Sequence, residues 1–219
     1  MRLSQVLLPL IVGPLACLAA DPARPVEPTV SWIDPADPSV AAIRRTGEPA
    51  ITRIGSTMIF EVQWTIADKG LAGAVDVLHL KNLALPKSAP GEPQITAIKR
   101  TSLLIRNPAN APDTADRAAL EKIKAALEDG ADIPKLLIQR LNRADAPPEW
   151  RIYQPIGTMP QCVKCHGPVE NLQPEVRAAI VRRFPDDQAT GYSVYSWRGV
   201  IRLSLSAPES TAPGKTKSP

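Results

Sequence analysis

The stretch Cys162-Val163-Lys164-Cys165-His166-Gly167 determines how the rest of this sequence is interpreted. Two cysteines three positions apart can each form a thioether bond to a haem vinyl group, and the histidine that follows can bind the iron as its proximal ligand. A redox disulfide or half of a zinc site would use the same cysteines. Zinc needs further ligands, however, and outside the motif the only other histidine and cysteine are His79 and Cys17. The motif therefore predicts one haem c, attached covalently through Cys162 and Cys165, with His166 bound to the iron.

Residues 1–20 have the pattern of a secretory signal peptide. Arg2 is followed by an apolar run over residues 6–12 and by small residues before Asp21. The run is too short for a stable membrane span. Because haem c is attached outside the cytoplasm, export and the haem motif support each other, and we expect a soluble periplasmic protein. The alternative is a lipid anchor through Cys17, although Pro14 departs from the usual pattern of such signals.

Length and composition indicate one globular domain after the signal. The chain has 219 residues, 44% of them hydrophobic, and a net charge of +4 that lies partly in Arg2, Lys215 and Lys217. This mild excess gives no support for nucleic-acid binding. Residues 21–55 are rich in proline and predict an extended tether, residues 56–206 the domain, and residues 207–219 a disordered polar tail.

Apolar periodicity predicts a helix over residues 57–80, with Ser56 or Thr57 as its N-cap. Gly70 and Gly73 predict a bend or close packing in its middle. Its apolar face is expected to comprise Phe60, Trp64, Ala67, Leu71, Ala74 and Leu78. Further helices are expected over residues 113–129, capped by Asp113 with Leu120, Ile123 and Leu127 buried, and over residues 174–184, with Val176, Ile180, Val181 and Phe184 on one face. Strands are expected over residues 95–106, 135–141, 150–156 and 192–205.

Four segments occur in an order that resembles a known family. They are Lys99-Arg100-Thr101-Ser102, residues 106–113, the haem motif, and Asp187-Gln188-Ala189-Thr190-Gly191-Tyr192 with Arg198-Gly199. Together they are similar to the single-haem c-type proteins with a PAS-like fold, over about residues 60–206. The resemblance implies an α+β fold, a PAS-like antiparallel sheet flanked by helices, with the N-terminal helix packing over the haem. Both electron transfer and redox or gas sensing have been suggested for that family.

The second axial position of the iron is expected to come from the first helix. Members of the family often carry a ligating cysteine late in that helix, whereas residues 74–80 contain none. His79 lies within one residue of the corresponding position, so we predict that it binds the iron opposite His166. Met58 and an open iron are the alternatives, since Met159 is too close to Cys162 to reach the other haem face.

Polar and aromatic residues of the resembling segments are candidates for the haem surroundings. Arg100, Arg106 and Arg198 could neutralise the haem propionates, or could be solvated strand charges. Tyr192 could line the pocket, together with Trp197 and Tyr153, or these rings could fill the core.

These features predict a periplasmic monohaem cytochrome that transfers single electrons with an unidentified periplasmic redox protein. The alternative is a haem-based redox or gas sensor that acts through a separate partner protein, since the sequence carries no kinase, cyclase or transmembrane output segment. We expect no enzyme activity, because no distal acid–base pair is visible.

Overall fold

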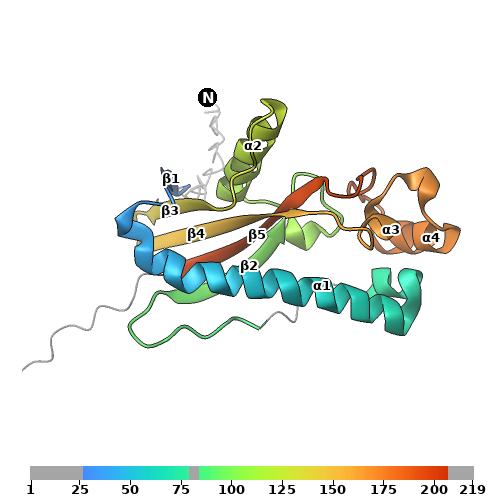
Figure 1. Cartoon of the computed structure of the whole chain (residues 1–219), viewed down its shortest axis with the longest axis horizontal. Coiled ribbons are helices and arrows are strands. Elements are labelled where there is room, and N and C mark those ends of the chain that lie inside the picture. Colours follow the sequence, from blue (N-terminus) through green and yellow to red (C-terminus); the bar gives the residue numbers. More distant parts are fainter. Residues whose placement is uncertain (1–26, 79–83, 207–219) are drawn as a thin grey trace, which may run out of the picture.

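A five-stranded antiparallel sheet forms the centre of the computed structural model, which describes residues 27–78 and 84–206 (Figure 1). Its spatial order is β1-β3-β4-β5-β2, and every neighbouring pair is antiparallel. Helices accompany the sheet, so the predicted α+β class, a PAS-like antiparallel sheet flanked by helices, is confirmed. The strands are β1 (Thr29–Ile33), β2 (Gln94–Thr101), β3 (Leu137–Arg143), β4 (Ala146–Gly157) and β5 (Trp197–Ser206).

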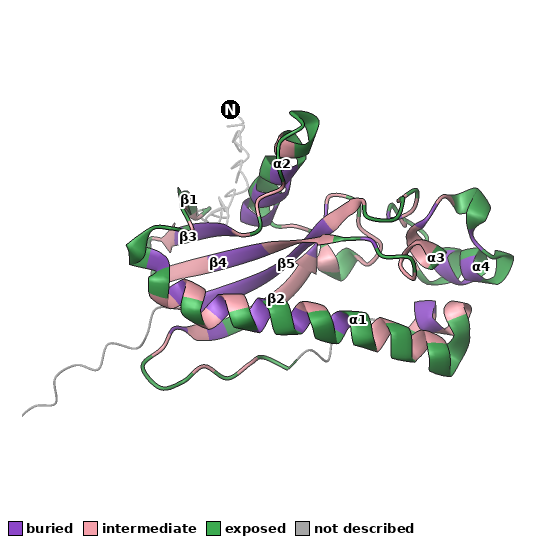
Figure 2. Ribbon diagram, viewed as in Figure 1, coloured by how far each residue is buried: buried purple, intermediate pink, exposed green. Residues whose placement is uncertain are grey.

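The sheet has two separate apolar cores, one on each face. Successive residues of a strand point to opposite faces. Ile152 and Ile201 cluster with α1 (Ala41–Val77), whereas their chain neighbours Tyr153 and Val200 cluster with α2 (Thr114–Glu128). Figure 2 shows the buried residues concentrated on the central strands and along one side of α1. The two long helices therefore cover opposite faces of the sheet.

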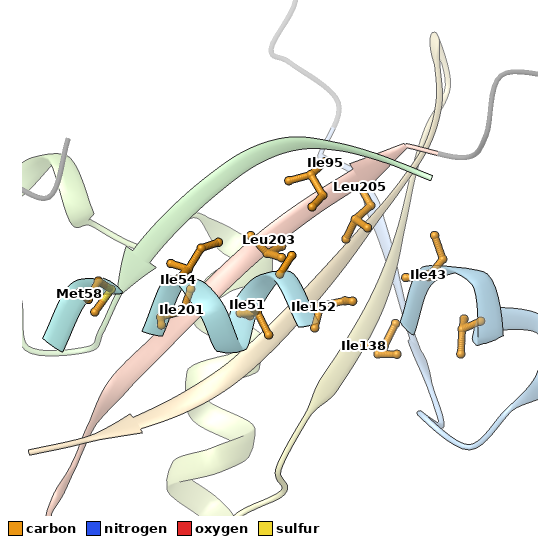
Figure 3. Close-up of a cluster of buried hydrophobic side chains, with 12 residues drawn as sticks. Ile43, Ile51, Ile54, Met58, Ile95, Ile138, Ile152, Ile201, Leu203 and Leu205 are labelled. Atoms are coloured by element: carbon orange, nitrogen blue, oxygen red, sulfur yellow. The ribbon is translucent and has the colours of Figure 1, made fainter. Parts of the chain in front are cut away.

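Helix α1 packs against the sheet through an isoleucine-rich side. Figure 3 shows its side chains gathered with those of β4 and β5. A Cβ atom at Gly47 would collide with the end of the Ile152 side chain, so any larger residue here would force that buried side chain to move. The buried side chains that α1 contributes to this core are Val40 at its N-cap, Ile43, Ala50, Ile51, Ile54 and Met58.

The predicted start of this helix is wrong, and its predicted apolar face is wrong for Phe60 and Trp64, whereas Ala74 is buried and Leu71 packs against the cluster around Val75 and Val176. It begins at Ala41, directly after a short 3-10 helix η1 (Pro38–Val40) capped by Asp37. Phe60 and Trp64 are 64% and 65% exposed and stack on each other at a centroid distance of 6.5 Å. The buried side is formed by isoleucines that precede residue 57, in the segment predicted as a tether.

The tether predicted over residues 21–55 is correspondingly wrong for residues 29–55. Residues 29–33 form β1, which pairs with β3 from Thr29 opposite Asn142 to Ile33 opposite Ile138. Proline count suggested an extended segment, yet prolines at the start of a helix cost it no hydrogen bond. Pro49 is the exception, inside α1 on an exposed position. The folded domain therefore includes residues 29–55 as well as the described residues that follow them.

Gly70 turns the chain back within α1. Its φ of 69° and ψ of 175° are non-helical, and this backbone region is almost restricted to glycine. The bend predicted at this position is confirmed. The short helical segment that follows packs through Val75 on α4 (Pro174–Arg183), against Val176 and Ile180. This reversal brings the end of α1 to the same end of the sheet as the haem motif (Figure 1).

Helix α2 is held to the opposite face by a buried charge network. Asp113 and Asp116 form a capping box at its N-terminus, as the predicted cap at Asp113 requires. The fully buried carboxylate of Asp116 accepts hydrogen bonds from Lys99 Nζ at 2.8 Å and from an Arg151 terminal nitrogen at 3.2 Å. Of the predicted buried stripe, Leu120 and Ile123 are buried and Leu127 is not. Lys99 therefore points to the α2 face, and Arg100, the next residue of β2, to the α1 face.

The remaining elements lie at the end of the sheet near the haem motif. They are η2 (Pro108–Asn110), α3 (Val163–His166), η3 (Val169–Asn171) and α4, which begins at Pro174 as predicted. Val181, expected on the buried face of α4, is exposed, because the side that meets α1 carries Val176, Ala179 and Ile180. The last strand begins at Trp197 rather than at residue 192.

Several predictions lie outside the described residues. These are the signal peptide over residues 1–20 with Cys17, the tail over residues 207–219, and His79. Within the part of the chain that the structure describes, no helix has the length and apolar character needed to cross a membrane.

Candidate functional site

A cavity of about 630 Å³ opens between α1, the sheet and the haem motif. Its volume lies within the range of about 300–1,000 Å³ that is usual for small-molecule and cofactor sites. Helix α1 and its folded-back end contribute one wall, which includes Ile59, Val62, Ile66, Ala74, Val75 and Leu78. The sheet contributes Gln154, Ile156 and Ile201. The site is therefore a largely apolar slot between the first helix and the sheet, at the end where α1 turns back.

The two cysteines and the histidine of the motif all line this cavity. They stand on one helical turn, in which the carbonyl oxygen of Cys162 accepts from the amide nitrogens of Cys165 at 3.1 Å and His166 at 2.9 Å. Residues three and four positions apart share one side of a helix. Both thiols are free. The turn thus presents two thiols and one imidazole to the same space.

The imidazole of His166 is fixed by the chain that follows the motif. Its Nδ1 atom lies 2.6 Å from the carbonyl oxygen of Ala189. A carbonyl oxygen only accepts, so Nδ1 carries the proton and Nε2 keeps its lone pair. Burial, reinforced by the positive charges of Arg106 and Arg198, holds the pKa of His166 well below its usual value. A neutral imidazole with a free Nε2 is the form that binds a metal.

Tyr192 contacts the motif but does not line the cavity. Its ring meets that of His166 edge-on, with centroids 6.4 Å apart, and its amide nitrogen donates to the carbonyl oxygen of His166 at 2.9 Å. The predicted pocket role of Tyr192 is therefore replaced by a supporting one. Trp197 and Tyr153 belong to the core on the α2 face.

The three predicted arginines all line the cavity, but their surroundings differ. Arg106 is paired with Asp187, with two nitrogen–oxygen distances of 3.0 Å, and donates to the carbonyl oxygen of Cys165 at 2.7 Å. Arg198 donates to Ser102 and to the carbonyl oxygen of Leu104, and its guanidinium lies 5.0 Å from the centroid of the Tyr192 ring. The guanidinium of Arg100 makes no hydrogen bond or ion pair within residues 27–78 and 84–206.

The candidates for a second iron ligand are partly outside the described chain. Leu78, which precedes His79, lines the cavity, while His79 itself is not described. Met58 lines the cavity and is 8% exposed as part of the α1 core. Met159 also lines the cavity, and its carbonyl oxygen accepts from the amide of Cys162 at 2.8 Å, at the start of the motif turn.

Sequence reasoning missed several polar residues of the cavity wall, namely Asn107, Asn110, Gln154, Thr158 and Tyr195. The Gln154 side-chain oxygen is buried and accepts no hydrogen bond from the described residues. Tyr195 has a positive φ of 67°, which is unusual for a non-glycine residue, and its side chain is 81% exposed. Asn107 and Asn110 lie in a segment that was quoted for the family resemblance, whereas nothing in the local sequence singles out Tyr195.

Comparisons with known proteins identify the family of this chain. A family model described as Tll0287-like matches residues 82–206, which include β2 to β5 and the whole haem motif. Among solved structures, that of the cyanobacterial haem protein Tll0287 is similar, with 20% sequence identity and a TM-score of 0.39. The match covers 69% of this chain and 91% of that chain. No curated protein sequence matches.

Proposed function

We propose that this chain, which belongs to the Tll0287-like family, binds one haem c covalently and carries single electrons in the periplasm. Cys162 and Cys165 would supply the thioether links and His166 the proximal ligand. The observation that carries the proposal is the convergence of two free thiols and one neutral imidazole on a single cavity. In its bound form, the haem would supply a one-electron iron couple.

The residues of the cavity fit such a group in three respects. The thiols stand on one helical turn, Cys162 at the N-cap of α3 and Cys165 within it, which suits attachment to two vinyl groups of one macrocycle. The wall formed by α1 is apolar over Ile59, Val62 and Ile66, which suits a flat hydrophobic ring. The charged residues among those lining the cavity are three arginines, which suit carboxylate substituents on that ring.

The chain's own contribution is to orient the imidazole and to exclude water. The hydrogen bond from His166 Nδ1 to Ala189 fixes the tautomer and makes the ligand more basic. A more basic ligand favours ferric iron and lowers the reduction potential. The apolar wall acts in the opposite direction, because burial in a low dielectric disfavours the more highly charged oxidised form. The balance of these two effects would set the potential.

Mass spectrometry of the protein, exported from a host that matures haem c, tests the attachment. The wild-type chain is expected to carry one haem that resists extraction by acidified organic solvent. Cys162→Ala and Cys165→Ala should each leave a single link, and the double variant none. Lys164→Ala changes an exposed residue between the cysteines and is the matched control, with haem content unchanged. A colourless wild-type product would refute the proposal.

Electron transfer is separated from the alternative, gas sensing through a partner protein, by ligand binding and by redox kinetics. A six-coordinate iron in an electron carrier resists carbon monoxide in the ferrous form, whereas a sensor with an exchangeable position binds it readily. Stopped-flow mixing with small one-electron donors and acceptors should give fast, reversible single-phase oxidation and reduction. Rapid carbon monoxide binding with slow redox exchange would favour the sensor.

A further inference from the structure

The cavity carries more positive charge than the protein neutralises. Arg100, Arg106 and Arg198 line it, and among the described residues that line it there is no carboxylate. Asp187 stands behind Arg106 and pairs with it at 3.0 Å. Three cations against one carboxylate leave an excess of two positive charges around an apolar slot. A buried excess of charge is unfavourable unless a counter-ion accompanies it, so the site is built for an anionic ligand.

Two of the three arginines are already committed to protein partners. The guanidinium of Arg106 is engaged by Asp187 and by the carbonyl oxygen of Cys165, with a side chain that is 12% exposed. Arg198 donates to the carbonyl oxygen of Leu104 at 2.9 Å and stacks on Tyr192. Both side chains therefore have clear structural roles, in holding the loops after β2 and before β5.

Arg100 differs from both. It pairs with Ile201 in the β2–β5 register, and Ile201 belongs to the α1 core, so Arg100 extends from β2 towards the cavity. Within residues 27–78 and 84–206 its guanidinium has neither a hydrogen bond nor an ion pair with a carboxylate. Burial, together with the like charges of Arg198 and Arg106, lowers the pKa of Arg100 to about 10. Five donors directed at a cavity with no protein acceptor indicate a missing ligand.

We infer that the guanidinium of Arg100 binds a carboxylate of the prosthetic group, one haem propionate, and that Arg106 and Arg198 serve mainly as structural supports. The inference rests on the proposed haem binding and assigns a specific contact within it. A guanidinium pairs with a carboxylate through two parallel hydrogen bonds, which gives Arg100 a positioning role for the ring as well as an electrostatic one. A positive charge on the cavity wall would also favour the ferrous form of a bound haem and raise its reduction potential.

The test compares holoprotein variants Arg100→Gln and Arg100→Lys with Arg117→Gln. Arg117 is an exposed residue of α2, on the opposite face of the sheet, so its variant controls for the change in net charge. Three quantities are measured: haem content by mass spectrometry, the resonance Raman bending bands of the propionates, and the reduction potential by spectroelectrochemistry. The Raman bands report propionate hydrogen bonding directly, which a purely structural arginine would not alter.

For Arg100→Gln we expect unchanged covalent haem, a shifted propionate band, and a lower potential. The oxidised-to-reduced ratio at fixed ambient potential should change about tenfold, which corresponds to about 59 mV for a one-electron couple. Arg100→Lys should retain the potential, because it keeps the charge, but shift the band, because it loses the two-pronged contact. Arg117→Gln should leave both unchanged.

Unchanged bands and potential in Arg100→Gln would overturn the inference while leaving haem attachment intact. If that variant fails to accumulate, Arg100→Lys decides: a shifted band supports the contact and an unshifted band refutes it. A wild-type protein without covalent haem refutes the proposed function itself. The two failures are therefore distinguishable.

Discussion

The Nδ1 atom of His166 lies 2.6 Å from the carbonyl oxygen of Ala189, a residue 23 positions further along the chain. Ala189 is held in turn by Asp187, whose Oδ1 atom accepts from the amide nitrogen of Ala189 at 3.0 Å. Asp187 also pairs with Arg106, which donates to the carbonyl oxygen of Cys165. A hydrogen-bond network thus connects three segments: the motif turn, the loop before β5 and the loop after β2. Its consequence is that the orientation of the imidazole depends on a buried ion pair that never touches the ring.

Substitution Asp187→Asn is expected to weaken this hydrogen-bond network and destabilise the fold. The side chains of Arg106 and Asp187 are 12% and 7% exposed, so removing the carboxylate leaves a buried guanidinium without a charge partner. The expected loss is about 3 kcal/mol of unfolding free energy, measured by denaturant titration. Asp76→Asn is the matched control, because Asp76 pairs with Arg182 at 2.8 Å in an exposed ion pair worth about 0–1 kcal/mol. Equal effects of the two variants would contradict the supporting role of Asp187.

Gly70→Ala should destabilise the protein through the backbone alone. The residue has φ 69° and ψ 175°, a conformation that costs a residue with a Cβ atom about 1–3 kcal/mol. No atom lies within 4 Å of the position where the Cβ would stand, so steric crowding contributes nothing. The neighbouring variant Lys69→Ala, at an exposed position, should change stability by no more than about 0.5 kcal/mol. Thermal unfolding of both variants measures the difference, and an unaffected Gly70→Ala would show that the turn is not required.

The turn at Gly70 also explains what could be predicted from the sequence and what could not. Glycines at 70 and 73 indicated a bend, and Asp113 indicated a helix start, because each depends on local backbone chemistry. The strands β3 and β4 were likewise predicted from local sequence patterns. Local chemistry does not report which side of a helix meets the sheet. Phe60 and Trp64 recur at helical spacing, yet the residues that pack on the sheet are the isoleucines one to three turns earlier.

In the candidate site, too, features within one short segment could be predicted, whereas those that depend on distant residues could not. The Cys162-x-x-Cys165-His166 spacing predicted that the three side chains act on one group, and they line one cavity, since three functional groups within five residues need no tertiary information. The difference between Arg100 and Arg106 could not be predicted, because it depends on Asp187, which is 81 residues from Arg106 in the chain. Likewise, no feature of the local sequence indicated that Tyr192 would support His166 from outside the cavity.

His79→Ala tests the predicted second axial ligand. Leu78 lines the cavity and His79 is the next residue of the chain. If His79 binds the iron, its removal should convert a low-spin six-coordinate spectrum into a high-spin five-coordinate one, and ferrous carbon monoxide binding should become fast. Met58→Leu is the parallel variant, since Met58 also lines the cavity. Optical and EPR spectra of the two variants assign the ligand, and a wild-type spectrum in both would exclude His79 and Met58 as the second axial ligand.

Acid should destabilise the fold partly through Glu149, on the α2 side of the sheet. Burial alone would raise the pKa of this carboxyl, but hydrogen bonds from Ser204, Arg151 and Arg143 outweigh it and lower the pKa to about 2. Because the folded pKa lies below the ordinary value of 4.5, the ionised carboxylate contributes stability that is fully present above pH 4.5 and is lost as the pH falls towards 2. Glu149→Gln should therefore cost up to about 3 kcal/mol at pH 7 and flatten the dependence of unfolding free energy on pH in this window. Urea titrations between pH 2 and pH 7 measure both effects, with Glu121→Gln on the exposed side of α2 as the control. An unchanged pH profile in Glu149→Gln would assign the acid sensitivity to other carboxylates.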